Sequence, residues 1–549
     1  MTNNPAPFEL SGHIVDVVGK RIFRGTVRVE QGKIAGIREE ETRESGYILP
    51  GLIDAHIHIE SSMLIPSGFA RMAVVHGTVA TVSDPHEIAN VLGIDGVRFM
   101  IANGKKVPFR FYFGAPSCVP ATPFETAGAV IGPEEVEELL RLEEVHYLSE
   151  MMNFPGVLFQ DEIVLRKLAL ARKYGKPVDG HAPGLRGEDA ARYAAAGITT
   201  DHECFTREEA LDKIRAGMKI LIREGSAARN FEALADLIDE YPDSVMLCSD
   251  DKHPNDLRTG HINELVKRAI GRGLDTMNVL RACTLNPVRH YSLGAGLLQP
   301  GDPADLIQVD DLAGFNIQSV FINGIKVAEN GKSLLEEVKE EPKNIFHASP
   351  VTAEQIAIPD KGKPVRVIRA FDGQLVTGES EAVLPSVQGQ LSGSPEQDIL
   401  KIVVKDRYTD APPAVGFIHG FGLKKGAIAS SVAHDSHNII AVGAEDVSLI
   451  RAINLIIATR GGISVVGDRE DLILPLPFAG IMSGENGLKV AEAYDSLDRK
   501  ARELGSPLRA PFMTLSFMAL LVIPELKMSD RGLFDGKNFK LTGIFAKGS

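Results

Sequence analysis

Short apolar runs that end in polar residues alternate with longer stretches of helical periodicity between about residues 50 and 286. Amphipathic stretches at residues 134–144 and 161–174 are examples of the predicted helices. The eight predicted strand ends are GLIDAHIHIE, TVATVSDPHE, FRFYFGAPS, VHYLSEMMN, KPVDGHAP, GITTDHE, MKILIREGS and SVMLCSDD. Because eight strand–helix units are what a (β/α)8 barrel requires, we predict an α/β protein with a TIM-like barrel over residues 50–294.

The segments on either side of this barrel have the texture of short strands. Residues 8–49 contain HIVDVVGKRIFRGTVRVEQGKIAGI, and residues 295–345 contain GLLQPGDPADLIQVDD and QSVFINGIKVAENGK. We predict that residues 1–49 join with 295–345 as one small β domain. After a charged, proline-containing linker, the region 346–549 mixes β runs such as VRVIRAF with a single long helical stretch at 444–460, which predicts a C-terminal α+β domain.

The composition narrows the possible function classes. A chain of 549 residues with 44% apolar residues is long enough for two or three buried cores. Its formal net charge of −14, without a basic stripe, argues against a nucleic-acid partner. The four cysteines are scattered without a C-x-x-C pair, which argues against disulfides and thiolate zinc sites. The start of the chain carries no signal-like segment, and the most apolar stretch, residues 513–523, is about half the length of a membrane span. We therefore expect a cytoplasmic protein without a membrane partner.

Candidate metal ligands gather at the carboxyl ends of the predicted strands. His56 and His58 are two residues apart in one strand, so both side chains project from the same face. Two packed core histidines are the alternative for this pair alone. The ends of later strands add four further candidates: Glu150, His181, His202 and Asp250. Because the carboxyl ends of barrel strands share one rim, we expect these six side chains to converge on a metal site.

Six protein ligands exceed what one tetrahedral catalytic ion takes, so we expect two divalent ions. Glu150 is the best candidate for a bridging carboxylate, because its strand lies between the paired histidines and the two single ones. Asp250, after the last strand, is the candidate base for the water that such ions activate. Nitrogen and oxygen ligands without thiolate suit Mn²⁺, Fe²⁺ or Zn²⁺.

Several segments match a known family. GLIDAHIHIESSM, SDPHEIANV, SEMMNFPGV, DGHAPGLRG, DHECFT, IREGSAARN and CSDDKHP resemble the amidohydrolase superfamily and, in detail, its bacterial and archaeal adenine deaminase branch. HDSHN, ATRGGI and LPLPFAGIMS resemble the C-terminal domain of that branch. The H-x-H motif alone is weak, whereas SEMMNFPGV and GSAARN together are highly specific.

The resemblance implies a function and a role for each ligand. The implied reaction is hydrolytic deamination of adenine, in which a metal-activated hydroxide attacks C6 and ammonia leaves. The implied metals are Mn²⁺ or Fe²⁺, with Zn²⁺ as an alternative. In the implied site, His56 and His58 bind the first metal, and His181 and His202 bind the second. Glu150 bridges the two metals. Asp250 binds the first metal and also shuttles protons. The strand VHYLSEMMN offers no lysine for carboxylation, which weighs against a dihydroorotase or hydantoinase activity.

Other residues are candidates for substrate contact. Asp251 follows the proposed base, but an aspartate before HPNDL is equally suited to begin a helix. Asp84, His86 and Glu87 follow the second strand, where they can orient ligands or contact the substrate.

Two more groups have less defined roles. Glu224, Ser226 and Arg229 follow the seventh strand and are candidates to line the pocket, with a surface ion pair as the alternative for Arg229. Three alternatives are open for His434, Asp435 and His437. They form a further metal site, they approach the barrel mouth of this or a neighbouring subunit, or they form a network within their own loop.

Two alternatives to adenine deamination stay open. One is another hydrolase on the same scaffold, such as a cyclic-amide hydrolase or an amino-sugar deacetylase. The other is a non-catalytic scaffold protein, which loss of ligands would favour, although no ligand is missing. The expected partners are adenine and water, and we expect a homo-oligomer, with a dimer favoured.

Overall fold

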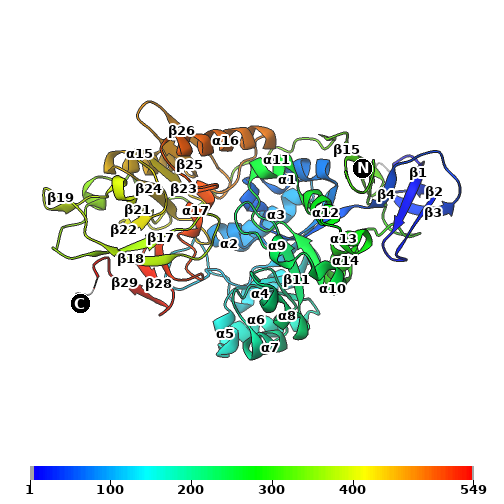
Figure 1. Cartoon of the computed structure of the whole chain (residues 1–549), viewed down its shortest axis with the longest axis horizontal. Coiled ribbons are helices and arrows are strands. Elements are labelled where there is room, and N and C mark those ends of the chain that lie inside the picture. The colour runs from blue at the N-terminus through cyan, green and yellow to red at the C-terminus, as the bar shows by residue number, and fades with distance from the viewer. Residues whose placement is uncertain (1–4, 547–549) are drawn as a thin grey trace.

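Three units lie in a row along the chain's longest axis (Figure 1). The computed structural model describes residues 5–546. A barrel occupies the middle, a β domain built from both of its flanks lies at one end, and the C-terminal domain lies at the other end. The fold class predicted from the sequence is therefore confirmed.

The barrel consists of parallel strands that follow one another in chain order. They are β5 (Leu52–Ile57), β6 (Thr78–Ser83), β7 (Arg110–Ala115), β8 (Val145–Met151), β9 (Val178–Gly180), β10 (Thr200–Asp201), β11 (Lys219–Arg223) and β12 (Val245–Cys248). The ring closes where the backbone N–H of Asp250 donates to the carbonyl oxygen of His56 at 2.9 Å. Between β9 and β10, the N–H of Thr199 donates to the carbonyl oxygen of Val178 at 2.8 Å. The carboxyl ends of all eight strands therefore face one rim.

Helices surround this ring, and their apolar positions explain how they pack. In the helix predicted at 161–174, Asp161 caps the N-terminus by accepting hydrogen bonds from the N–H groups of Ile163 and Val164. Val164, Leu168 and Ala171 then recur at helical spacing and are buried. The barrel helices are α1 (Pro66–Ala73), α2 (His86–Leu92), α3 (Ile94–Gly104), α4 (Pro133–Leu140), α5 (Phe154–Leu158), α6 (Glu162–Lys173), α7 (Gly187–Ala195), α8 (Arg207–Arg215), α9 (Phe231–Leu234), α10 (Leu237–Glu240), α11 (Pro254–Thr259), α12 (Ile262–Gly271), α13 (Thr276–Ala282) and α14 (Leu285–Tyr291).

The β domain joins the two flanks of the barrel in one sheet. Its strands, in spatial order, are β16 (Lys332–Ser333), β15 (Ile325–Glu329), β14 (Ile317–Ile322), β13 (Leu306–Val309), β4 (Tyr47–Pro50), β1 (Phe8–Asp16), β2 (Arg21–Glu30) and β3 (Lys33–Glu39). The junction is the antiparallel pair of β4 and β13, in which Pro50 lies opposite Leu306. Ile14, Val27 and Phe321 belong to the core that covers this sheet.

The C-terminal domain is built on a mixed sheet. Its strands, in spatial order, are β18 (Gly378–Ala382), β17 (Val365–Arg369), β22 (Ala414–His419), β21 (Ile399–Lys405), β24 (Ile439–Gly443), β23 (Ala427–Ser430), β25 (Gly462–Val466) and β26 (Asp471–Pro475). The predicted helix at 444–460 is α15 (Asp446–Thr459), whose Leu449 and Ile453 pack on the sheet. Smaller hairpins pair β19 (Ser386–Val387) with β20 (Gln390–Leu391), and β28 (Gly532–Asp535) with β27 (Leu526–Ser529) and β29 (Lys540–Thr542).

A second long helix in this domain, α16 (Gly487–Glu503), corrects our expectation of a single one. Its buried positions Val490, Tyr494 and Leu497 recur at helical spacing, but Glu492 and Asp495 lie between them. The apolar stretch at 513–523 begins within α17 (Pro511–Phe517), where it is buried against the rest of the protein. Within residues 5–546, no helix combines the length and the apolar character needed to cross a bilayer.

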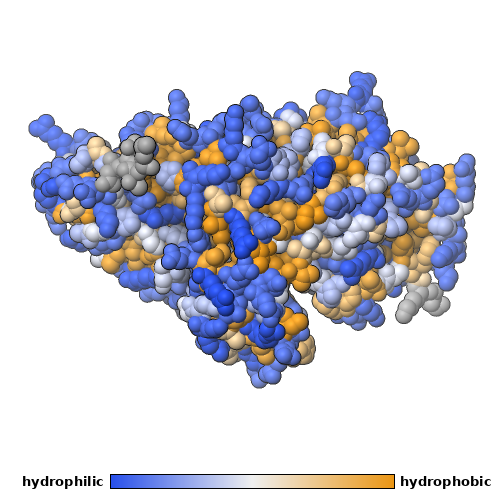
Figure 2. Space-filling view, turned by 180° about the vertical axis from the view of Figure 1, so that it is seen from behind, coloured by the Kyte–Doolittle hydropathy of each residue, from blue (hydrophilic) through white to orange (hydrophobic). Residues whose placement is uncertain are grey.

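Apolar residues gather near the middle of one face, beside the projecting lobe that carries α4 to α8 (Figures 1 and 2). On that lobe the side chains of Phe159 and Ile163 are 85% and 55% exposed.

Candidate metal centre

The two histidines of β5 face the carboxylate that follows β12. His56 and His58 lie on the same side of their strand because side chains alternate along it. Nε2 of His58 lies 3.3 Å from Oδ1 of Asp250, and Nε2 of His56 lies 3.7 Å from the same oxygen. All three side chains are buried. The three donor atoms therefore surround one small volume, as the ligands of one ion do.

Glu150, at the end of β8, lies between this group and two further histidines. Its Oε1 is 3.4 Å from Nε2 of His58. Its Oε2 is 2.8 Å from Nδ1 of His181 and 3.1 Å from Nε2 of His202. One oxygen thus faces the β5 histidine and the other faces the histidines that follow β9 and β10. This is the arrangement that a bridging carboxylate needs.

The donor atoms fit divalent metal ions. Among the described residues, both ring nitrogens of His56 and Nε2 of His181 are buried without a hydrogen-bond partner, and such unsatisfied polar atoms are rare unless another group uses them. Burial, followed by the nearby His202 and His58, holds the pKa of His56 well below its ordinary value. A neutral imidazole is the form that binds a metal. Nitrogen and carboxylate donors without thiolate suit Mn²⁺, Fe²⁺ and Zn²⁺.

Arg223 and Glu203 are functional candidates that the sequence analysis missed. Nη1 of Arg223 donates to Oδ2 of Asp250 at 2.5 Å, and Nη2 donates to Oε2 of Glu203 at 2.8 Å. Burial alone would raise the pKa of Asp250, but the Arg223 guanidinium outweighs it and holds this pKa well below its ordinary value. Asp250 also has a φ of 56°, in the left-handed region that few non-glycine residues adopt. Its carboxylate is therefore ionised and fixed in place.

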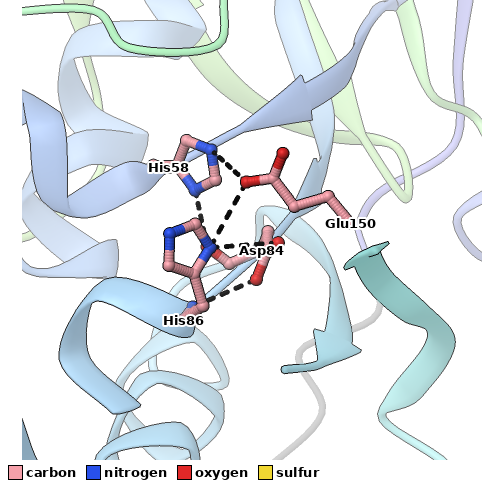
Figure 3. A group of neighbouring side chains, drawn as sticks. All are labelled: His58, Asp84, His86 and Glu150. Carbon is pink, nitrogen blue, oxygen red and sulfur yellow. Dashed lines mark hydrogen bonds and ion pairs between the residues drawn. The ribbon is translucent and has the colours of Figure 1, made fainter. Parts of the chain in front are cut away.

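Of the three candidate residues after β6, Asp84 and His86 lie beside the proposed metal ligands, whereas Glu87 faces the C-terminal domain. Figure 3 shows His86 and Asp84 beside His58 and Glu150. Nδ1 of His86 lies 3.2 Å from Oδ2 of Asp84 and 3.5 Å from Oε1 of Glu150. Glu87 instead turns its two oxygens to His434 and His437 of the C-terminal domain. The loop that carries these two histidines thus approaches the barrel mouth of its own chain.

Asp251 lies in the cavity wall, where the Ser61 hydroxyl donates to its Oδ1 at 2.5 Å. Burial and then the negative charge of Asp250 raise its pKa. The alternative role as a helix cap does not match the structure, because α11 begins at Pro254 and its cap is His253.

Three predicted residues do not line the cavity, which corrects our expectation for them. Glu224 pairs with Arg268 of α12 at 2.6 Å, because side chains alternate and Arg223 before it points inward. The hydroxyl of Ser226 accepts from the backbone N–H of His253 at 2.9 Å. The guanidinium of Arg229 donates to the carbonyl oxygen of Gly225 at 2.9 Å. These contacts shape the loop that carries Ala228, which does line the cavity.

Ionisable side chains line most of the cavity beside the ligands, and apolar residues from two domains complete its wall. Met152 and Ala228 come from the barrel, and Leu375, Phe517 and Leu520 come from the C-terminal domain. We call these last three residues the roof. The cavity therefore combines an apolar surface with many ionisable groups that face the ligands.

Known protein families match the two larger units. The profile described as Amidohydrolase family matches residues 47–327, and the profile described as Adenine deaminase C-terminal domain matches residues 374–540. A curated relative named Adenine deaminase, from Methanosarcina mazei, is 55% identical over 97% of this chain and 99% of its own length. The chain belongs to the adenine deaminase branch of the amidohydrolase family.

Other relatives with this name agree. The adenine deaminase of Salinibacter ruber is 55% identical over 98% of this chain and 99% of its own length. The adenine deaminase of Sulfurovum sp. (strain NBC37-1) is 56% identical over 97% of this chain and 98% of its own length. The similarity to the adenine deaminase branch therefore covers all three units of the fold, and the resemblance found in the sequence is confirmed.

Proposed function

We propose that this chain catalyses the hydrolytic deamination of adenine to hypoxanthine and ammonia. The observation that carries the proposal is the position of Glu150, whose two oxygens face two separate sets of histidines beside a cavity that residues of two domains line. Relatives named for this reaction, at 55–56% identity over nearly the whole chain, support it.

We propose two divalent ions in the centre. His56, His58 and Asp250 would hold one, His181 and His202 would hold the other, and Glu150 would contact both. When bound, such ions make water a strong nucleophile near neutral pH. Mn²⁺ or Fe²⁺ is our proposal for their identity, with Zn²⁺ as the alternative.

Proton transfer is the task we assign to Asp250. Its carboxylate is ionised because Arg223 holds its pKa low, and it faces the centre of the site. It takes a proton from the water that adds to C6 of adenine and delivers it to the exocyclic nitrogen. The C–N bond then breaks, ammonia leaves, and the oxygen stays on C6 of hypoxanthine.

Binding of the flat base is the task of the cavity walls. The roof residues and Met152 exclude water and offer apolar surfaces. Asp251, with its raised pKa, is placed to hydrogen-bond a ring nitrogen, and His86 to orient Glu150. Relatives are named for deamination of the free base, so we propose that adenosine is a poor substrate.

An ammonia-release screen tests this function. The full-length chain, loaded with Mn²⁺, Fe²⁺ or Zn²⁺, is assayed with adenine, adenosine and cytosine, and separately for opening of cyclic amides and deacetylation of amino sugars. Chelated protein is the blank, and Glu224→Gln, outside the cavity, is the matched control for Glu150→Gln. Metal-dependent turnover of adenine is expected. Turnover of only a cyclic amide or an acetylated sugar, or of nothing in metal-loaded protein, would contradict the proposal.

We also propose a homodimer. The exposed Phe159 and Ile163 of the lobe supply apolar surface of the kind that subunit contacts use. Light scattering of the full-length chain tests this, and a mass of one chain at all concentrations would contradict it.

A further inference from the structure

A second cluster of ionisable side chains lies where the barrel meets the C-terminal domain, and the proposed reaction uses only its His86, which orients Glu150. His86 and Glu87 begin α2 of the barrel. His434, Asp435 and His437 lie in the loop between β23 and β24. All five side chains are buried, although their sequence positions are far apart.

The donor atoms of this cluster have the spacing of a metal site. Nε2 of His86 lies 3.5 Å from Oε1 of Glu87 and 3.8 Å from Oδ1 of Asp435. Nδ1 of His434 lies 3.9 Å from the same Asp435 oxygen and contacts Oε1 of Glu87. Ligands bound tetrahedrally at 2.0–2.2 Å lie about 3.3–3.6 Å apart. Small shifts of these four atoms would therefore complete a first coordination shell.

Hydrogen bonding does not account for the cluster. Among residues 5–546, Oδ2 of Asp435 is buried without a hydrogen-bond partner. A buried carboxylate oxygen without a partner is costly. Asp435 also acts on its surroundings, because burial and then its negative charge raise the pKa of Glu125 to about 8. A cation beside Asp435 would balance this charge.

We propose that His86, Glu87, His434 and Asp435 form a third divalent-cation site, which borders the same cavity as the two-ion centre. His437 contacts the other oxygen of Glu87 and orients it, as second ligands of this kind commonly do. Two nitrogens and two oxygens without thiolate suit Zn²⁺, Mn²⁺ or Fe²⁺. The ion would join α2 to the loop whose His434 ring lies 5.5 Å from the roof residue Phe517. It would thus fasten the roof to the barrel.

Metal stoichiometry tests this site. The full-length chain is dialysed against excess Mn²⁺ or Zn²⁺, separated from free metal, and analysed by mass spectrometry. We expect about three equivalents in the wild type and about two in Asp435→Asn. Glu150→Gln removes the bridging charge of the two-ion centre and should keep about one, because Nε2 of His86, the nitrogen that faces Asp435, does not contact Glu150. Asp530→Asn is the matched control with about three, because Asp530 is another buried carboxylate between the domains and bonds only Thr126 and Asn438.

The competing explanation is that these side chains form a network of ion pairs without a metal. Burial lowers the pKa of His434, but the negative charges of Glu87, Asp251 and Asp435 outweigh it and raise this pKa to about 9, so a protonated His434 can pair with these carboxylates. Two equivalents in both the wild type and Asp435→Asn would establish that network and overturn the third site. Should Asp435→Asn fail to fold, anomalous diffraction from Mn²⁺-loaded wild-type crystals decides. A peak between His86 and Asp435 is expected, and peaks at the two-ion centre alone would overturn the proposal.

Discussion

Arg223 binds Asp250 and Glu203 at the same time, so one buried guanidinium offsets part of the negative charge of two buried carboxylates. Replacing it with methionine removes the arginine partner of both carboxylates and leaves them only histidine neighbours. A loss of about 3–5 kcal/mol in the free energy of unfolding is expected for breaking such a buried pair. Turnover should fall by at least about 10²-fold, because the pKa of Asp250 rises and its position is no longer fixed. Urea denaturation and ammonia release measure the two effects. Arg229→Met is the control, and equal behaviour of the two variants would contradict this role.

Glu150→Gln should lose metal and activity together. A neutral amide in place of the carboxylate removes the negative charge that offsets two dications. Elemental analysis and turnover, compared with Glu224→Gln, check this. Near-native turnover with full metal content would mean that Glu150 does not bridge.

Asp250→Asn should keep most of its metal and lose about 10²–10⁴-fold in turnover. Asparagine keeps an oxygen for the metal but removes the proton acceptor. The loss should occur in both kcat and kcat/KM, because the interaction belongs to the transition state. Near-native turnover in the folded, metal-loaded variant would remove the proton shuttle from the mechanism.

Opening the roof should change the substrate preference. Phe517→Ala removes a large side chain that the C-terminal domain places over the cavity. We expect the ratio of kcat/KM for adenosine to that for adenine to rise by about 10-fold, the range that one lost apolar contact gives. Phe159→Ala, on the exposed lobe, is the control. An unchanged ratio in Phe517→Ala would show that the roof does not exclude the ribose.

Asp498 of α16 should make stability depend on pH. Burial, opposed by Arg502, raises its pKa from 3.8 to about 6, so the folded state binds the proton more tightly than the unfolded state. Its contribution is therefore fully present below about pH 4 and lost as the pH rises through 6. Asp498→Asn removes this dependence and should be more stable than the wild type by up to about 2–3 kcal/mol at pH 8, with little difference at pH 4. Urea denaturation at both pH values measures this, and equal stability at pH 8 would contradict it.

The barrel was predictable from sequence because its signals are local. Every barrel strand except β7 ends beside a histidine or carboxylate, and helices such as α6 carry their caps and apolar stripes within a few residues. The ligand positions at strand ends follow from the same periodicity. Alternation along β11 would also have selected Arg223 instead of Glu224, had it been followed to the end of the strand.

The roof and the interdomain cluster could not be predicted in this way. Phe517 and His434 line the cavity because the C-terminal domain packs against the barrel. The hydrophobic periodicity of a single helix or strand does not predict such contacts between domains. α16 was missed for a related reason. Its apolar stripe is narrow, and tertiary packing, including the ion pair of Arg258 with Asp495 at 2.6 Å, stabilises it.

The pairing of β4 with β13 has a consequence for how the chain is made. Pro50 and Leu306 face each other although about 250 residues separate them, so on the ribosome the first strands emerge long before their partner exists. β1 to β3 can form a hairpin-like sheet early, but β4 keeps an unpaired edge until the entire barrel has been synthesised. The sheet can therefore be completed only after the barrel, which lies between the two halves of the sheet in the sequence, has been translated. A chain truncated within the barrel would display that edge to other proteins and invite aggregation or capture by chaperones.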